Sequence, residues 1–578
     1  MSHLVKRDYR SFSALSLAVV LLGAACAPQT NRAGSGPSSP SQAEAPRAPK
    51  VLTIAMQREL KDFTRFSGTA FGGGQPGSGN NQIAKIAHNY LAFEERGTGV
   101  IEPQLAAELP SVEKGTWLIN PDGSMDVIWK LRPNVKWHDG TSFTASDLVF
   151  GSQLFRDADF PTVPDVRLKL VESTSAPDPL TFVVHWSTTV SSATDPVDFD
   201  PLPKHLLEEL YRSDKLAIVS SPLISSAFVG LGAYRVDRWE PGVGIEFVRF
   251  DDYYLGRPSL DRVIVRYVGD PNTMLATIMA GAVDIVLAPG PDLQAAAEVK
   301  KRWEGTGSRV LTSLSGSQQF LRPQFRTEYA LPKNGAPLLS VRRALYHGVD
   351  HQSLTEAAGN GLPPAADSWL APNHPWRSLL ESYVPQYPYD PAKALQLLAE
   401  AGWVRGADGV LTHAASGERF ESKIVARPTP EAEKTLAVLA DGWKRLGIQL
   451  QLEVLPSSLA SDRKTLGTVP VALMSSFPPS PTNLPPMHSS QLASEANRWG
   501  GTNYQGYSNP RVDALMDRIR GTIDVREQIP LHGQLVQEAY TDVAFIPLYW
   551  QVDPVFILKG INGIVANDTF NIAQWTKD

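Results

Sequence analysis

The chain has 578 residues, of which 42% are hydrophobic, 20% charged and 9% aromatic, with 44 glycines, 46 prolines and one cysteine. This composition is typical of a globular protein, and it excludes a collagen, a disulfide-stapled scaffold and a chain that is disordered throughout. The formal net charge is −6, and lysine and arginine are spread along the sequence without a basic stripe. We therefore expect no nucleic-acid partner.

The N-terminus resembles that of an exported protein. Three basic residues precede an uncharged, mostly apolar stretch over 12–25, which is too short for a comfortable membrane span but suits a signal peptide. The stretch leads into LGAAC at 22–26, which resembles the bacterial lipobox, where the cysteine is acylated and becomes the first residue. We predict a lipoprotein signal peptide over 1–25 and lipidation of Cys26. The protein would then be extracytoplasmic, on the periplasmic or cell-surface side, and held to the membrane by lipid alone.

The segment over 26–50 is dominated by Pro, Ser, Ala, Gly and Gln and has almost no large apolar side chain. Such a segment cannot offset its ordering entropy, so we expect a disordered tether.

Folded sequence begins with a predicted strand over 51–55. Further along, a strand over 263–268, a helix over 270–280 and a strand over 283–287 predict a βαβ unit with parallel pairing.

Three later helices have clear boundaries in the sequence. Asp390-Pro391 begins one helix and Asn509-Pro510 begins another, each with a capping side chain before a proline at the first helical position. A third, over 436–446, ends at Gly447 and is followed by an alternating strand over 448–454. Strands interleaved with helices along the whole body predict α/β domains.

Familiar catalytic patterns are absent from the sequence. It contains no G-x-S-x-G elbow, no H-E-x-x-H pair and no Walker loop, and its single cysteine belongs to the predicted lipidation site. We therefore predict no catalytic residue and no cofactor.

His347 and His351 lie four residues apart in a predicted helix over 341–351, a spacing that could place both rings on a shared metal. With no third ligand nearby in the sequence, two surface histidines are the favoured interpretation, and we predict no metal site.

Several stretches, in order from about residue 51 to 578, resemble bacterial extracellular solute-binding proteins of family 5, the group that serves peptide- and nickel-type ABC importers. WKLRPNVKWHDG at 129–140, leading into TASDL at 144–148, is the most specific of them. The others are LAAEL at 105–109, PDG at 121–123, GAY at 232–234, DDYY at 251–254, AGAVDI at 280–285, VRRAL at 341–345, YDP at 389–391, AGW at 401–403 and YSNP at 507–510.

The resemblance implies an α/β, two-lobed periplasmic-binding-protein fold of type II, with an extra subdomain in the first lobe and a hinge of two crossing strands. Residues 309–325 and 544–549 suit the two crossings. The implied boundaries are lobe I over 51–325 with the inserted subdomain at about 60–230, lobe II over 326–543, and a return to lobe I over 544–578.

The resemblance also implies a function without bond chemistry, in which a monomeric receptor encloses a small-molecule or peptide solute and delivers it to ABC permease subunits in the membrane. Peptide-binding relatives carry an aspartate in lobe II that pairs with the free amino group of the peptide. The corresponding stretch here, 474–483, has no carboxylate, and 465–494 contains no Asp, Glu, Lys or Arg. If this stretch faces the cleft, the departure argues against an ordinary free peptide and favours an uncharged polar or amphipathic solute, such as a sugar or a modified, peptide-like one. The alternative is a proline-rich loop that points away from the cleft.

Candidate ligand-binding residues are drawn from the predicted crossings and from loops expected to face the cleft. They are Phe71, Arg322, Gln324, Phe477, Asn483, Trp499 and Trp550.

Two other functions stay open from the sequence. One is a membrane-anchored extracytoplasmic glycosidase that uses two carboxylates, and the other is a metal or metallophore carrier centred on His347 and His351.

Overall fold

A computed structural model describes residues 48–578 except 65, 67–78, 96–97, 162–165 and 196–198. The predicted signal peptide, Cys26, nearly all of the predicted tether and Phe71 lie outside the described residues. The chain divides into two units, Met1–Ala48 and Pro49–Asp578, and everything below concerns the second. Within the described residues, no helix has the length and apolar character needed to cross a membrane.

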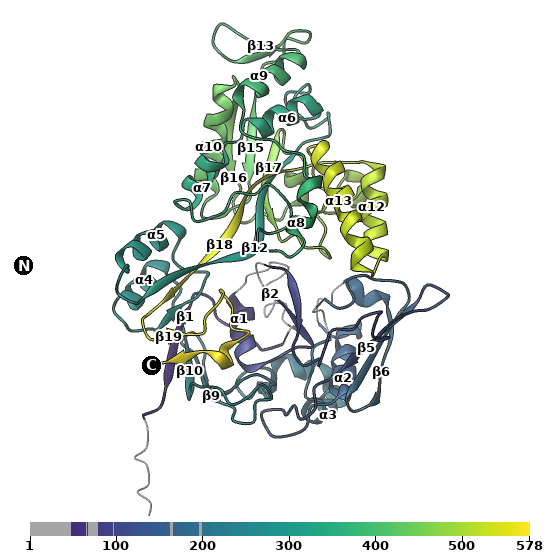
Figure 1. The fold of residues 1–578 in the computed structure, drawn as a ribbon, viewed down its shortest axis with the longest axis vertical. Coiled ribbons are helices and arrows are strands. Elements are labelled where there is room, and N and C mark those ends of the chain that lie inside the picture. The colour runs from purple at the N-terminus through teal and green to yellow at the C-terminus, as the bar shows by residue number, and fades with distance from the viewer. Residues whose placement is uncertain (1–47, 65, 67–78, 96–97, 162–165, 196–198) are drawn as a thin grey trace, which may run out of the picture. The chain divides into compact units, whose positions relative to one another are not determined.

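The largest sheet in the described part of the chain has ten strands and extends through both lobes (Figure 1). Its order is β16 (Gln449–Val454), β15 (Glu421–Ala426), β17 (Ala472–Phe477), β12 (Arg309–Pro323), β18 (Ile546–Ile557), β11 (Ile285–Val286), β1 (Val51–Met56), β10 (Arg262–Tyr267), β9 (Gly244–Arg249) and β8 (Tyr234–Glu240). The first three strands belong to lobe II and the last five to lobe I. The long strands β12 and β18 join the two sets.

Lobe I is built around β1. Strands β10 and β11 both pair with β1 in parallel, and helix α4 (Pro271–Met279) connects them. The predicted βαβ elements are therefore present, but the two strands do not pair with each other, because β1 lies between them. Alternate residues of β1 and β10, such as Leu52, Ile54 and Val263, enter the core and are fully buried.

A separate antiparallel sheet forms inside the range predicted for the inserted subdomain. As described, its order is β4 (Trp117–Ile119), β5 (Met125–Lys130), β7 (Thr181–Trp186) and β6 (Val171–Asp178), with α2 (Ala145–Arg156) and α3 (Lys204–Asp214) beside it. Its own core contains the buried Trp129, Trp137 and Trp186. The hairpin β2 (Ala92–Glu95) and β3 (Val100–Pro103) turns through Gly99, whose φ of +68° favours glycine.

Lobe II has helices on both faces of its part of the sheet (Figure 1). Helices α6 (Leu339–His347), α7 (His351–Gly359), α9 (Pro391–Glu400) and α10 (Ala432–Arg445) contribute to one core, and α12 (Pro510–Gly521) and α13 (Val525–Thr541) to the other. The predicted helix starts are confirmed, since Asp390 accepts from the Lys393 N–H and Asn509 from the Arg511 N–H. The remaining elements are α1 (Gly79–Ala87), α5 (Leu293–Arg302), α8 (Arg377–Leu380), β13 (Trp403–Arg405), β14 (Leu411–His413), α11 (Arg463–Gly467), β19 (Ile561–Asn562) and β20 (Thr576–Lys577).

The helix predicted over 341–351 is wrong as a single element. Helix α6 ends at His347, and the side chain of Asp350 accepts from the Ser353 N–H to begin α7 at His351. The two histidines therefore do not share a helix face. The His347 ring contacts the Pro388 carbonyl at 2.8 Å and the His351 ring contacts the Pro547 carbonyl at 3.0 Å.

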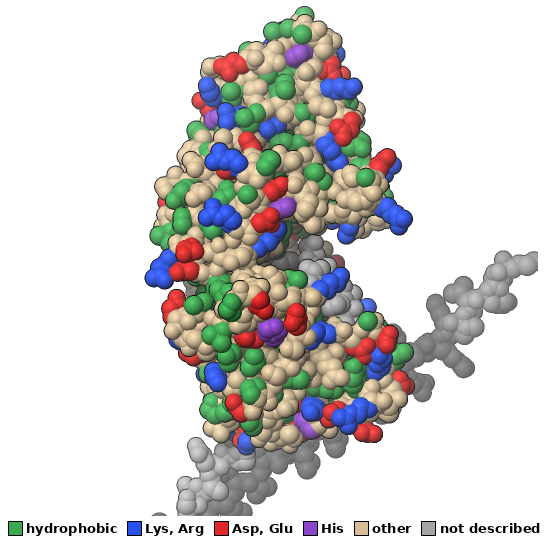
Figure 2. All heavy atoms as spheres, turned by 90° about the vertical axis from the view of Figure 1, so that its right-hand side faces the viewer, with side chains coloured by type: hydrophobic (Ala, Val, Ile, Leu, Met, Phe, Trp, Pro, Cys, Tyr) green, Lys and Arg blue, Asp and Glu red, His purple; other side chains and the backbone are tan. Residues whose placement is uncertain are grey.

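The C-terminus returns to lobe I. The second half of β18 pairs with β11 and with the first half of β12. Near the end of the chain, the Lys577 ammonium donates to the Val51 carbonyl at 2.8 Å and to Asp284 at 2.7 Å. On the face drawn in Figure 2, basic and acidic side chains are interspersed without a basic stripe.

Candidate functional site at the crossing strands

Strands β12 and β18 carry the chain between the lobes. They pair antiparallel from Arg309 with Ile557 to Leu314 with Val552, lose register, and pair again from Gln318 with Trp550. Beyond the irregularity β12 also pairs with β17 of lobe II. The predicted range 309–325 contains β12, whereas 544–549 covers only the lobe II part of β18, which pairs with lobe I strands from Val552 onward. The loss of regular pairing falls between the part paired with lobe I and the part paired with lobe II.

Two of the predicted site residues flank the same residue of β12 at this crossing. Phe477 on β17 and Trp550 on β18 are the register partners of Gln318 on β12, one on each side of it. The Trp550 side chain is fully buried, and its indole nitrogen has no hydrogen-bond partner among the described residues. Serines 313, 315 and 317 on β12 are also nearly buried. The crossing therefore combines small polar side chains with two large aromatic rings.

Arg322 lies on the same face of β12 as Gln318, because four residues separate them. One of its terminal nitrogens donates to the Thr502 carbonyl at 2.9 Å. Its guanidinium carbon lies 5.2 Å from the ring centre of Phe320 and 5.4 Å from that of Tyr504. Burial lowers the pKa of Arg322 to about 10, so the side chain remains a cation at neutral pH.

Three other predicted site residues make contacts within lobe II. The Gln324 amide is fully buried and donates to the Gly467 and Val469 carbonyls at 3.1 and 2.8 Å. Asn483 is exposed and donates to the Pro478 carbonyl at 2.8 Å, which closes its loop. Trp499 has a φ of +60°, and Arg326 lies 5.5 Å from its ring centre. A binding role for these three residues stays a prediction.

The loop that follows β17 contains no carboxylate and reaches lobe I. A β-carbon added at Gly99, in the β2–β3 turn of lobe I, would lie 3.8 Å from Cβ of Ser480 and 3.6 Å from Cδ2 of His374. The lobes also touch elsewhere, since the Ser191 N–H donates to the Arg520 carbonyl at 2.9 Å. A notch between the two lobes is visible in Figure 2.

An aromatic and histidine cluster beside this loop was not anticipated from the sequence. The rings of Trp369 and Trp376 meet His532 edge-on, with centroids 5.7 and 5.6 Å away, and Trp376 also meets His374 at 5.8 Å. Burial lowers the pKa of both histidines to about 4. The residues come from a loop and from α13, so no local pattern joins them. His374-Pro375-Trp376 is the nearest to a signal that the sequence offers.

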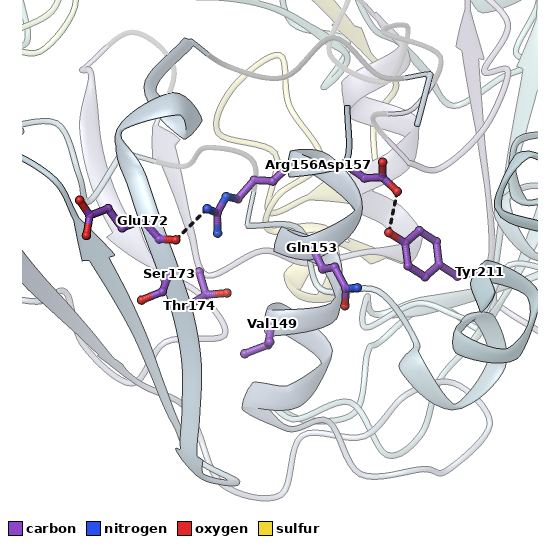
Figure 3. A pocket seen from close by; sticks show the side chains of 8 residues that line it. All are labelled: Val149, Gln153, Arg156, Asp157, Glu172, Ser173, Thr174 and Tyr211. Carbon is purple, nitrogen blue, oxygen red and sulfur yellow. Dashed lines mark hydrogen bonds between the residues drawn. The ribbon is translucent and has the colours of Figure 1, made fainter. Parts of the chain in front are cut away.

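A second hollow lies on the inserted subdomain, away from the crossing strands. It is an open groove between α2, β6 and α3 (Figure 3). Its charged groups are largely occupied, because Arg156 donates to the Val171 and Glu172 carbonyls and Asp157 accepts from Tyr211 and Lys215. These bonds hold the pKa of Asp157 at about 2 and, with burial, raise that of Tyr211 to about 12.

Comparison with known proteins identifies the protein family. Residues 101–497 match the model of bacterial extracellular solute-binding proteins, family 5. The chain belongs to this family. Family 5 proteins are extracytoplasmic binding proteins rather than enzymes, and this member is an α/β solute-binding protein with two lobes joined by crossing strands.

Individual relatives of this family 5 protein are distant in sequence but match most of its length. The oligopeptide-binding protein AppA of Bacillus subtilis is 24% identical over 78% of this chain and 81% of its own length. Heme-binding protein A of Haemophilus influenzae is 24% identical over 85% and 86%. A substrate-binding protein of an ABC transporter from Listeria monocytogenes, CtaP, has 18% identity and a TM-score of 0.71, covering 92% of this chain and 100% of its own. NikZ from Campylobacter jejuni, solved with Ni(L-His), has 23% identity and a TM-score of 0.66 with the same coverage.

Proposed function

We propose that this protein captures a solute between lobe I and lobe II and delivers it to the permease subunits of an ABC importer. The crossing of β12 and β18 is the observation that carries the proposal. Each lobe has its own buried cores, so the lobes can rotate about the two strands without either core being repacked. A solute that contacts both lobes shifts the equilibrium toward the closed form. Moving it from 1:99 to 99:1 takes a preference of about 5.5 kcal/mol.

Lipid on Cys26 and the segment over 26–50 would keep this receptor close to its permease. A flexible tether of that length raises the effective concentration of the receptor at the membrane without adding a contact. In this proposal the receptor works as a monomer and makes or breaks no bond in its solute.

The solute that suits the site is peptide-like or polar, and it needs no free amino group for recognition. Phe477 is partly exposed and offers an apolar face at the crossing, where it flanks Gln318 opposite the fully buried Trp550. An apolar face among polar side chains suits uncharged polar groups attached to an apolar body. The loop that reaches Gly99 contains no carboxylate to balance an ammonium group. Enclosing an amino group against this wall would leave its charge unpaired, at a cost of a few kcal/mol.

Neither alternative gains a specific observation in its favour. The metal or metallophore carrier was centred on His347 and His351, whose rings now bond to different backbone carbonyls. Among the described residues, no group of three or more His, Cys, Asp or Glu side chains could hold a metal ion. The glycosidase requires two carboxylates placed across a sugar, and no such pair stands out at the crossing strands.

Native mass spectrometry tests the proposal directly. A soluble form that starts at residue 27 is purified gently, measured, unfolded, refolded and measured again. We expect a stoichiometric extra mass that disappears on refolding and is reduced in Gln318→Ala, with Asn334→Ala as a control in lobe II away from the crossing strands. Turnover of a chromogenic glycoside, or solute binding that is abolished only by a chelator, would contradict the proposal.

A further inference from the structure

Among the described residues, no acidic side chain forms an ion pair with Arg322. Its contacts are the Thr502 carbonyl and the rings of Phe320 and Tyr504, and its Nε is buried without a hydrogen-bond partner among the described residues. Arg427 lies near enough to oppose the charge, which adds to the effect of burial in lowering the pKa of Arg322. An unpaired cation at such depth is costly unless an anion accompanies it.

The elements around Arg322 do not supply that anion. The stretch 465–494, which includes β17 and the loop after it, has no carboxylate. Tyr507 in the pocket wall donates its hydroxyl to Asp542 at 2.9 Å, and Asn509 donates to the same carboxylate at 2.8 Å, so Asp542 already has partners. The neighbouring, partly buried Arg326 differs in this respect. Arg326 donates to the carbonyls of Ala493, Gly467 and Tyr504, so its donors are used by the backbone.

Arg322 lines a small pocket inside lobe II. The pocket has room of about 30 Å³ at its centre, enough for a group of two or three heavy atoms. Its wall is mostly apolar, with two amide side chains, and it consists of Phe320, Phe325, Pro485, Pro486, Met487, Asn503, Gln505, Tyr507, Ala544 and Phe545. The Arg322 side chain is partly exposed and forms part of the wall of this recess.

We propose that this pocket binds a carboxylate, held by the free donors of Arg322. Arginine presents parallel N–H groups that match the two oxygens of a carboxylate. The carboxylate can come from a free small acid, such as acetate. It can also belong to the transported solute, because Pro485–Met487 line the pocket and the same loop reaches lobe I at Ser480. Only this second source rests on the proposed receptor function.

Acetate is the probe that tests the pocket. Calorimetric titration and thermal unfolding are measured with sodium acetate and, at equal ionic strength, with sodium chloride. We expect acetate to bind the wild-type chain and to raise its unfolding temperature more than chloride does, since a ligand of the folded state stabilises it. Arg322→Gln should weaken acetate binding about tenfold or more. Arg427→Gln, which removes a nearby cation that does not line the pocket, should retain it.

Two further measurements keep the outcomes distinct. Arg322→Lys preserves the charge and should bind acetate more weakly than wild type but more tightly than Arg322→Gln, which separates loss of charge from loss of fold. The mass of captured solute is measured by native mass spectrometry in the same variants. If it is lost in Arg322→Gln together with acetate binding, the carboxylate belongs to the solute, and if it is retained, the pocket holds a free acid. The proposal is overturned if the wild-type chain does not bind acetate, or if Arg322→Gln binds it as tightly as wild type does. In either case, solute capture by the wild-type chain still tests the receptor function separately.

Discussion

His532 on α13 should make lobe II sensitive to acid. Its side chain is fully buried against Trp369 and Trp376, and neither ring nitrogen makes a well-aligned hydrogen bond among the described residues. Burial, and to a smaller extent the neighbouring His374, lower its pKa from 6.5 to about 4 against the opposing effect of the Pro481 carbonyl. The folded state therefore holds this imidazole neutral.

The sign of the pH effect follows from that shift. Between the unfolded pKa of 6.5 and the folded pKa of about 4, the unfolded chain binds a proton that the folded chain does not. Stability therefore falls as the pH is lowered through this window and is greatest above it. For His532 alone, the free energy of unfolding should drop by about 2 kcal/mol between pH 7 and pH 5, and by about 3 kcal/mol once the pH is below 4.

The assay is urea unfolding at pH 7, 6 and 5, comparing wild type with His532→Leu. Leucine has a similar volume and removes two unpartnered nitrogens, so the variant should lose little stability at pH 7. It should also lose about 2 kcal/mol less than wild type on going to pH 5. His347→Leu, at a partly exposed histidine of the same lobe, is the control and should leave the slope near that of wild type. Equal acid sensitivity of wild type and His532→Leu would refute the reasoning.

Three other substitutions test the packing. Trp550→Ala should lower the unfolding free energy by about 3–5 kcal/mol in urea titrations, because it empties a fully buried site at the crossing, and an unchanged midpoint would contradict this packing. Gly467→Ala should cost about 1–3 kcal/mol in thermal unfolding, since its β-carbon would lie 2.5 Å from Cζ3 of Trp499, and Trp499→Leu should recover part of the loss. Asp350→Ala should cost about 1 kcal/mol by removing the cap of α7, whereas Asp350→Asn should restore most of it.

Local chemistry allowed much of the fold to be predicted. The starts of α9 and α12 follow from a capping side chain with a proline after it, and both elements begin where the sequence indicated. The same logic failed at 341–351, where the apolar pattern continued through a break. Gly348 follows the last residue of α6, and Asp350 is itself a capping residue, so the signals were present but were outweighed by periodicity.

The candidate site depended on pairing between distant segments. Phe477 and Trp550 were both proposed from the sequence, but their meeting on either side of Gln318 results from the register of three strands. Gln324 was proposed on equal grounds and donates to two backbone carbonyls of its own lobe. Sequence spacing along a strand indicates the face on which a residue lies, but it does not indicate what lies opposite.

Motifs and periodic patterns made of residues close together in the chain were enough to indicate the family and the alternation of strands and helices. The tertiary structure decided which polar groups lack partners. The surroundings of the Arg322 charge and of the His532 ring are set by residues more than 150 positions away, such as Thr502 and Trp369. Burial raises the cost of an unpaired polar group, and burial is a property of the folded chain rather than of any local segment.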